Sequence, residues 1–302
     1  MELFLQHLLQ GLKFGSIYAL IALGYTMVYG VLRLINFAHG DVFMLGAMVS
    51  IYFARWTGWD AHPSWLSLLG ILMLAMAACG LVGGLIERVA YRPLRHAPRL
   101  SLLITAIGVS LLIENVGQLP QIFGATPQAF PNLIETRLLI SWNNLTLSNV
   151  EALVFVVAVV LMFLLHAIVH HTRLGLAMRA VSFNFQTASL MGVNVNQVVS
   201  FTFILGSALA GAAGVLFGLS YPSIDPLTGL IPGIKAFVAA VLGGIGNIPG
   251  ALLGGFLIGL AETFTAAYIS STYKDAIAFV ILIVVLLVRP SGLMGRKFVE
   301  KV

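Results

Sequence analysis

Long apolar runs recur along almost the whole chain, and they constrain its fold more than any other feature. About 20 apolar residues suffice for one helix to cross a bilayer. Candidate segments lie at 11–31, 40–55, 64–86, 101–119, 150–170, 200–219, 233–246, 250–270 and 273–289. With 59% hydrophobic and 9% charged residues, the 302-residue chain cannot cover a water-facing surface, which excludes a soluble enzyme. We expect an all-α fold, a polytopic transmembrane helical bundle with eight or nine spanning helices.

Two stretches predict short or broken helices, near 31–41 and 233–250. The segment 233–246 would form only about 21 Å of helix, and it runs into the glycine-rich sequence GGIGNIPG. Such interrupted pieces are typical of discontinuous helices in transporters. If this segment re-enters the membrane instead of crossing it, the number of crossings is eight and not nine.

Basic residues predict the topology. They are concentrated in 87–99, in 171–199 and in the C-terminal group Arg289, Arg296, Lys297 and Lys301. The positive-inside rule places these regions and the C-terminus in the cytoplasm, and nine crossings put the N-terminus outside. On this topology the outer basic residues are Lys13, Arg55, Arg137, Lys235 and Lys274. Residues 1–302 then form one transmembrane domain with an external loop at 120–149 and a cytoplasmic loop at 171–199.

Ionisable side chains inside the membrane are costly and suggest function. Glu262 lies in the middle of an apolar segment, where it either lines a pathway or makes an internal structural hydrogen bond. Glu114 lies toward the outer end of its segment, where a structural or snorkelling role is the alternative to a pathway role.

The turn between the first two segments contains Asn36, His39 and Asp41. On one interpretation Gly40 breaks the helix and Asp41 caps the next helix. On the other, the turn lies at membrane depth and faces a water-filled pathway or gate. The pathway candidates are therefore Asn36, His39, Asp41, Glu114 and Glu262.

A small residue recurs at every fourth position in 200–219, which predicts close packing of this helix against a neighbour. The stripe consists of Gly206, Ala210, Gly214 and Gly218.

The loop 171–199 can form a short helix between Ala180 and Gly192, with Ser182 or Asn184 as its N-cap. Its apolar side chains either contact a partner or fold back onto the bundle. They are Phe183, Phe185, Ala188, Leu190 and Met191.

Motifs for catalysis are missing from the sequence. It contains no G-x-x-x-x-G-K-[ST] nucleotide loop, no G-x-S-x-G elbow and no H-E-x-x-H pair. Cys79 is the single cysteine, so we expect no metal site and no cofactor in this chain. The basic balance follows the loops and indicates membrane topology, not binding of nucleic acid.

Several motifs together resemble the LivH-like permease subunit of branched-chain amino acid ABC importers. They are YTMVYG (25–30), INFAHGD (35–41), ERVAYRP (87–93), ASLMGVNV (188–195), KAF (235–237), VLGGIGNIPGA (241–251) and RPSGLMGR (289–296). The resemblance runs nearly end to end and weakens in 56–75 and 120–149. Single motifs are shared with urea and sugar permeases of the same superfamily.

The resemblance implies a subunit without its own ATPase site in a bacterial inner membrane. Its expected partners are a second, homologous permease chain, two cytoplasmic ATPase subunits that bind ATP and Mg, a periplasmic or lipid-anchored binding protein, and membrane lipid. The alternatives are a permease for urea or another small polar solute, and a proton-coupled secondary transporter that uses Glu262 or Asp41.

It further implies that the short inner helix is a coupling helix that docks on an ATPase. The residues assigned to that contact are Ser182, Asn184, Phe185, Ala188, Leu190, Met191, Gly192 and Val193.

Overall fold

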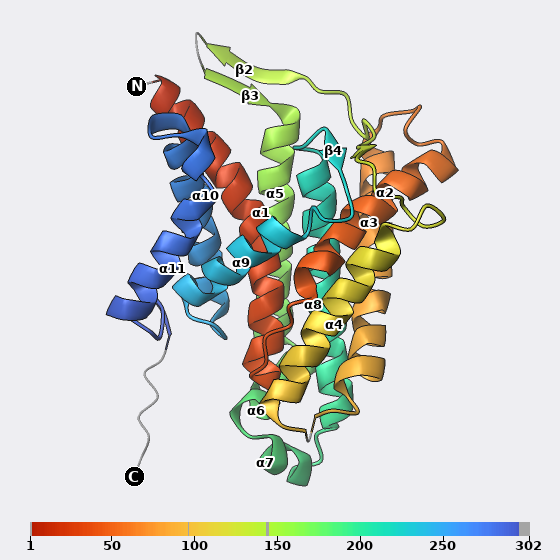
Figure 1. The fold of residues 1–302 in the computed structure, drawn as a ribbon, viewed down its shortest axis with the longest axis vertical. Coiled ribbons are helices and arrows are strands. Elements are labelled where there is room, and N and C mark those ends of the chain that lie inside the picture. Colours follow the sequence, from red (N-terminus) through yellow and green to blue (C-terminus); the bar gives the residue numbers. More distant parts are fainter. Residues whose placement is uncertain (1, 96, 143–144, 296–302) are drawn as a thin grey trace.

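Eleven α-helices form an elongated bundle in the computed structural model, which describes residues 2–95, 97–142 and 145–295 (Figure 1). The C-terminal basic residues Arg296, Lys297 and Lys301 lie outside the described residues. The long helices are α1 (Glu2–Leu32), α2 (His39–Thr57), α3 (Trp65–Ile86), α4 (Arg99–Gly117), α5 (Asn149–His171), α8 (Val195–Gly218) and α10 (Ile248–Tyr268). The shorter ones are α6 (Arg173–Phe183), α7 (Phe185–Leu190), α9 (Leu230–Gly243) and α11 (Ala276–Val288). A π-helix, η1 (Glu87–Tyr91), continues α3, and a 3-10 turn, η2 (Ser271–Tyr273), precedes α11.

Polar side chains begin several of these helices by accepting a hydrogen bond from a free backbone N–H of the first turn. Ser148 accepts from the Glu151 N–H at 3.2 Å, and Glu151 accepts in return from the Ser148 N–H at 3.1 Å, which completes a capping box for α5. Further side-chain N-caps are Ser64, Thr172, Asn184, Asn194 and Asn247.

Helix α1 lies in the centre of the bundle and packs against α5, α8, α9 and α10 (Figure 1). Its contact with α10 is made backbone to backbone: a Cβ atom at Gly255 would lie 2.5 Å from the Ala19 Cα, and one at Gly259 would lie 2.4 Å from the Gly15 Cα. Close approach through small residues is how helices associate in lipid, where dispersion contacts replace the hydrophobic effect.

The predicted number of eight or nine spanning helices is wrong when helices are judged by their length and composition. In the described part, six helices are long and apolar enough to cross a membrane: α1, α3 continued through η1, α4, α5, α8 and α10. The expected spans 233–246 and 273–289 correspond to α9 and α11, which have 14 and 13 residues. At 1.5 Å per residue these helices reach about 20 Å, short of the roughly 30 Å hydrocarbon core. Helix α2 has 19 residues but is not one of the six, because its first turn contains the polar residues His39 and Asp41, which make the helix less apolar.

Both predicted breaks are confirmed. After α1 ends at Leu32, Arg33 adopts φ 55° and no helix forms until His39. After α9 ends at Gly243, Gly244 and Gly246 adopt φ values of 102° and 94°, a left-handed backbone that glycine tolerates. Since neither conformation fits an α-helix, the chain can change direction inside the apolar sequence.

Two ends of the bundle can be distinguished in Figure 1. The N-terminus of α1 and the antiparallel hairpin of β2 (Leu138–Trp142) and β3 (Leu145–Ser148) lie at one end, here named the hairpin end. Helices α6 and α7 lie at the other, here named the α7 end. The short strands β1 (Gln128–Ala129) and β4 (Ser223–Ile224) pair antiparallel and join the loop after α4 to the loop after α8.

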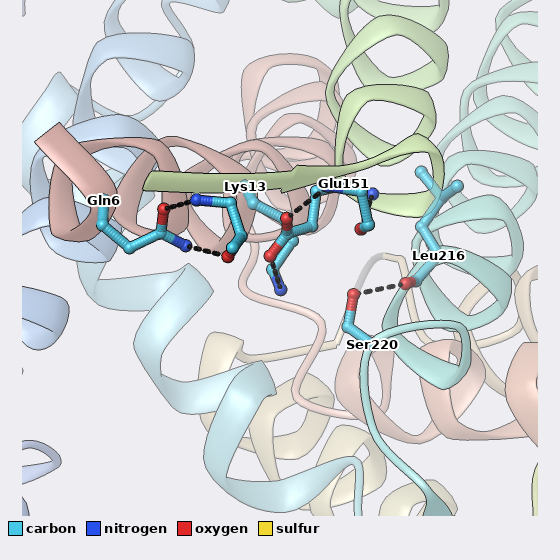
Figure 2. A network of polar contacts seen from close by, with 7 residues as sticks. Gln6, Lys13, Glu151, Leu216 and Ser220 are labelled. Atoms are coloured by element: carbon cyan, nitrogen blue, oxygen red, sulfur yellow. Dashed lines mark hydrogen bonds and ion pairs between the residues drawn. The ribbon is translucent and has the colours of Figure 1, made fainter. Parts of the chain in front are cut away.

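The hairpin is fixed to α1 by polar contacts, shown in Figure 2. The Gln6 Oε1 accepts a hydrogen bond from the Thr146 N–H at 2.9 Å, and the Lys13 Nζ lies 3.4 Å from the Glu151 Oε1. These contacts connect the N-terminal part of α1 to strand β3 and to the start of α5.

Candidate functional site

A cavity of about 410 Å³ opens where α2, α4 and α9 meet, with contributions from α1 and α11. This volume lies within the roughly 300–1,000 Å³ of pockets that bind small molecules. The residues that line it are Tyr25, Phe37, Gly40, Asp41, Ile107, Ser110, Leu111, Glu114, Gly229, Leu230, Gly233, Ile234, Phe237, Val238 and Leu282.

Asp41 is held in this cavity and does not cap α2. The helix begins at His39, its N-cap is Ala38, and no side chain caps it. The Asp41 Oδ2 instead accepts a hydrogen bond of 2.5 Å from the Ser110 Oγ of α4. The interpretation of Asp41 as a helix cap is therefore wrong, as is that of Gly40 as a helix breaker, since Gly40 belongs to the first turn of α2.

Gly40 allows α2 and α9 to meet at the cavity. A Cβ atom at Gly40 would lie 2.7 Å from the Gly229 carbonyl oxygen, and one at Gly233 would lie 2.8 Å from the Gly40 Cα. The N-termini of both helices thus approach the same cavity. Helix N-termini carry partial positive charge and favour anionic groups.

Glu114 is the second carboxyl group in the cavity. It is buried, and it interacts with Asp41 across the gap between α4 and α2. The described residues that line the cavity include no lysine, arginine or histidine. The cavity thus combines two carboxyl groups, two helix N-termini and a mostly apolar wall with the rings of Tyr25, Phe37 and Phe237.

Asn36 and His39 lie beside the cavity without lining it. The Asn36 Oδ1 accepts a 2.8 Å hydrogen bond from the Tyr91 hydroxyl, and both residues are buried. The His39 ring packs edge-on against the Tyr25 ring with centroids 4.8 Å apart. A Cβ atom at Gly24 would lie 2.1 Å from the His39 Nε2, so glycine at 24 makes room for this ring.

Glu262 lies in a separate buried network that the sequence did not reveal. The Lys235 Nζ of α9 lies 2.7 Å from the Glu262 Oε1 and 2.5 Å from the Asp275 Oδ1, and the Tyr18 hydroxyl donates to the Glu262 Oε2 at 2.7 Å. Lys235, which the sequence counts among the outer basic residues, is only 3% exposed and lies inside the bundle. Burial and the nearby carboxylates of Glu262 and Asp275 raise the pKa of Tyr221, in the loop after α8, to about 12.

The predicted packing stripe on α8 faces several neighbours. A Cβ atom at Gly206 would lie 3.3 Å from the Gly24 carbonyl oxygen of α1, and one at Gly214 would lie 2.3 Å from the Phe43 carbonyl oxygen of α2. Gly218 faces the ring of Phe130, and Ala210 is fully buried.

The α7 end carries the predicted inner helix. Asn184 is its N-cap, because the Asn184 Oδ1 accepts a hydrogen bond of 2.9 Å from the Thr187 N–H. Ser182 belongs to α6, where its hydroxyl donates to the Arg179 carbonyl. Helix α7 is shorter than the expected Ala180–Gly192 span, since Asn184 adopts extended backbone between the two helices.

Gly192 and Val193 end the turn after α7. Gly192 adopts φ 83°, and the Val193 N–H donates to the Ala188 carbonyl at 3.0 Å. This closes α7 against the start of α8 and buries Ala188.

The other large apolar side chains at α7 point away from the bundle. Phe183 and Leu190 are each 87% exposed and Met191 is 80% exposed, while Phe185 is partly exposed. Beside them lies a groove of about 1330 Å³, whose lining includes Arg33, Arg92 and Arg95. Exposed apolar groups gathered at one helix are typical of a contact with another protein.

No group of three or more His, Cys, Asp or Glu side chains is placed for metal binding among the residues that the structure describes.

Comparison with known proteins identifies relatives of nearly full length. Residues 7–286 match the family described as branched-chain amino acid transport system / permease component. The chain is 46% identical to the high-affinity branched-chain amino acid transport system permease protein BraD of Pseudomonas aeruginosa, over 99% of this chain and 98% of BraD. It is 42% identical to the corresponding permease protein LivH of Escherichia coli K12, with the same coverage.

A more distant similarity involves the ribose import permease protein RbsC of Escherichia coli K12, which is 32% identical over 39% of each chain. No solved structure matches the chain.

Proposed function

The chain belongs to the branched-chain amino acid transport system permease family, and we propose that it moves branched-chain amino acids across a bacterial cytoplasmic membrane as one subunit of an ATP-driven importer. Full-length identity above 40% to two such permeases supports this substrate class over sugars, since the ribose permease matches only 39% of the chain. The chain itself holds no ATP or Mg, and separate ATPase subunits supply the energy.

The cavity between α2, α4 and α9 is the observation that carries this proposal. A branched-chain amino acid has an ammonium group, a carboxylate and an apolar side chain. Asp41 and Glu114 suit the ammonium group, the N-termini of α2 and α9 suit the carboxylate, and the rings of Tyr25, Phe37 and Phe237 suit the apolar part. We assign the cavity to the translocation pathway, with Asn36 and His39 supporting its wall.

The exposed apolar residues of α7 are the proposed contact with an ATPase subunit, and on that basis we infer that the α7 end faces the cytoplasm, in agreement with the cytoplasmic C-terminus that the basic residues predict. A second, homologous permease chain and a periplasmic or lipid-anchored binding protein complete the importer. ATP-driven closure of the ATPases would move α7, and the permease would alternate between states that differ in their contacts with the solute.

Reconstitution tests the proposal. The chain is assembled in proteoliposomes with its second permease, the ATPases and the binding protein, and uptake of leucine, urea and ribose is measured with and without ATP. We expect ATP-dependent uptake of leucine alone, and none by the isolated chain. Uptake by the isolated chain under a proton gradient would contradict the proposal, and ATP-dependent uptake of urea or ribose in place of leucine would overturn the substrate assignment.

A further inference from the structure

Glu87 is fully buried at the α7 end of the bundle, in the π-helix that continues α3. Burial of a carboxylate is costly unless it is paired and hydrogen-bonded. The transport pathway proposed above does not include Glu87. The contacts of Glu87 indicate a role in coupling two parts of the bundle.

One carboxylate oxygen of Glu87 is bound to the start of α8 directly, and the other is linked to it through Arg95. The Glu87 Oε2 accepts a hydrogen bond of 2.6 Å from the Ser200 hydroxyl of α8, and the Glu87 Oε1 pairs with the Arg95 guanidinium. The Arg95 Nη1 in turn donates to the Asn196 Oδ1 of α8 at 2.6 Å. Since α8 begins four residues after Met191, these contacts join Glu87 to the segment that carries α7.

The π-helix η1 is also connected by hydrogen bonds to the turn that precedes the cavity residue Asp41. Its backbone makes the wide i to i+5 hydrogen bond, from the Arg92 N–H to the Glu87 carbonyl at 2.7 Å. Tyr91, at the end of this turn, donates its hydroxyl to the Asn36 Oδ1 at 2.8 Å. The Asn36 carbonyl accepts from the His39 N–H at 3.1 Å, and Asp41 of the cavity lies two residues further on.

We propose that Glu87 is a positioning residue that transmits movement of the α7–α8 corner, through η1 and Tyr91, to the α1–α2 turn at the cavity. This inference rests on the proposed function, because it assumes that an ATPase moves α7. Every link is a hydrogen bond or ion pair between residues of α8, η1, the segment after η1 and the turn, and the buried charge keeps η1 and α8 together when the corner moves.

The test measures ATP hydrolysed per leucine imported, in proteoliposomes that contain the full importer. Glu87→Gln keeps the shape of the side chain but removes its charge. We expect the ratio to rise about fivefold or more, the size typical of a lost coupling between sites, while the complex still assembles and hydrolyses ATP. A purely structural role would lower uptake and hydrolysis together and leave the ratio unchanged, which would overturn the inference.

Glu151→Gln is the matched control, since Glu151 is a partly buried, ion-paired glutamate at the hairpin end (Figure 2). It should leave the ratio unchanged. If the Glu87→Gln complex fails to assemble, Tyr91→Phe decides, because it removes only the hydroxyl that contacts Asn36. The inference holds if Tyr91→Phe raises the ratio and fails if it does not.

The double variant adds a second criterion. If Glu87 and Tyr91 act in one path, Glu87→Gln with Tyr91→Phe should raise the ratio no more than the stronger single variant, whereas multiplied effects would contradict a single path. Wild-type uptake in the same vesicles separates the two proposals: its absence would refute the proposed function, while normal wild-type uptake with an unchanged Glu87→Gln ratio would refute only this inference.

Discussion

The Lys235 Nζ and the Glu262 Oε1 lie 2.7 Å apart inside the bundle, on two helices that a glycine-rich turn separates. Asp275 and Tyr18 complete this network, so four helical segments meet at one ammonium–carboxylate pair. Removal of Lys235 leaves the buried Glu262 carboxylate without a cationic partner, which costs far more than the pair itself contributes.

Lys235→Met is therefore expected to lower the free energy of unfolding by about 3–5 kcal/mol. The measurement is SDS-induced unfolding in mixed micelles. Lys13→Met serves as the control, because the Lys13–Glu151 pair is more exposed and should contribute about 0–1 kcal/mol. The variant with both Lys235→Met and Glu262→Gln should be more stable than Lys235→Met alone, and a further loss of stability would show that the two residues are not a pair.

Leu190→Asp should detach the ATPase, because it places a charge in an apolar contact. We expect the variant to fold and insert normally but to retain less than about a tenth of the ATPase in co-purification, equivalent to about 1.4 kcal/mol or more. Leu139→Asp is the control, since Leu139 is similarly apolar and exposed but lies at the hairpin end. Equal retention of the ATPase by both variants would remove α7 from the contact.

Asp41→Asn should reduce uptake of leucine by about tenfold or more, as expected when a contact to a charged group worth about 1.5–3 kcal/mol is lost. Initial rates over a range of leucine concentrations in proteoliposomes measure the effect. Asp60→Asn is the matched control, because Asp60 is exposed and lies outside the cavity. A wild-type rate for Asp41→Asn would exclude this carboxylate from the pathway.

Gly214→Ala should destabilise the bundle by about 1–3 kcal/mol, because the new Cβ would lie 2.3 Å from the Phe43 carbonyl oxygen and backbone cannot move aside easily. Gly108→Ala offers the opposite case. Apart from the adjacent turns of α4 itself, no described part of the chain comes within 4 Å of a Cβ at position 108, so alanine should stabilise α4 by about 0.5–1 kcal/mol. The same unfolding measurement compares both variants, and equal effects would contradict the packing argument.

The sequence revealed the helical breaks but not their tertiary partners. Gly244 and Gly246 are recognisable in a sequence because a run of glycines cannot continue a helix, and the break near Asn36 follows from polar residues between apolar runs. The sequence gives no sign that Lys235 is buried, because a lone lysine at the start of a short apolar segment resembles a helix boundary at the membrane surface. Only the fold brings Glu262 and Asp275 to it, from 27 and 40 residues away.

The cavity could not be predicted from the sequence for the same reason, because its residues come from separate segments. Asp41 and Glu114 were predicted separately, as a turn residue and a helix-end residue, and nothing in either local pattern indicated that they face each other. Their meeting depends on how α4 lies against α2, which hydrophobic periodicity alone does not define. The number of spans is overestimated from the sequence because an apolar run does not show where the helix within it begins and ends: α11 begins only after Asp275 and ends at Val288.

The central position of α1 has a consequence for biosynthesis. This helix is made before α8, α9 and α10, yet it is largely buried against them. The hydrogen bond from the Tyr18 hydroxyl to Glu262 can form only after residue 262 has been made. The central helix of the bundle thus reaches its final neighbours only late in synthesis, and a chain truncated before α10 would leave the face of α1 that packs on α10 without its partner.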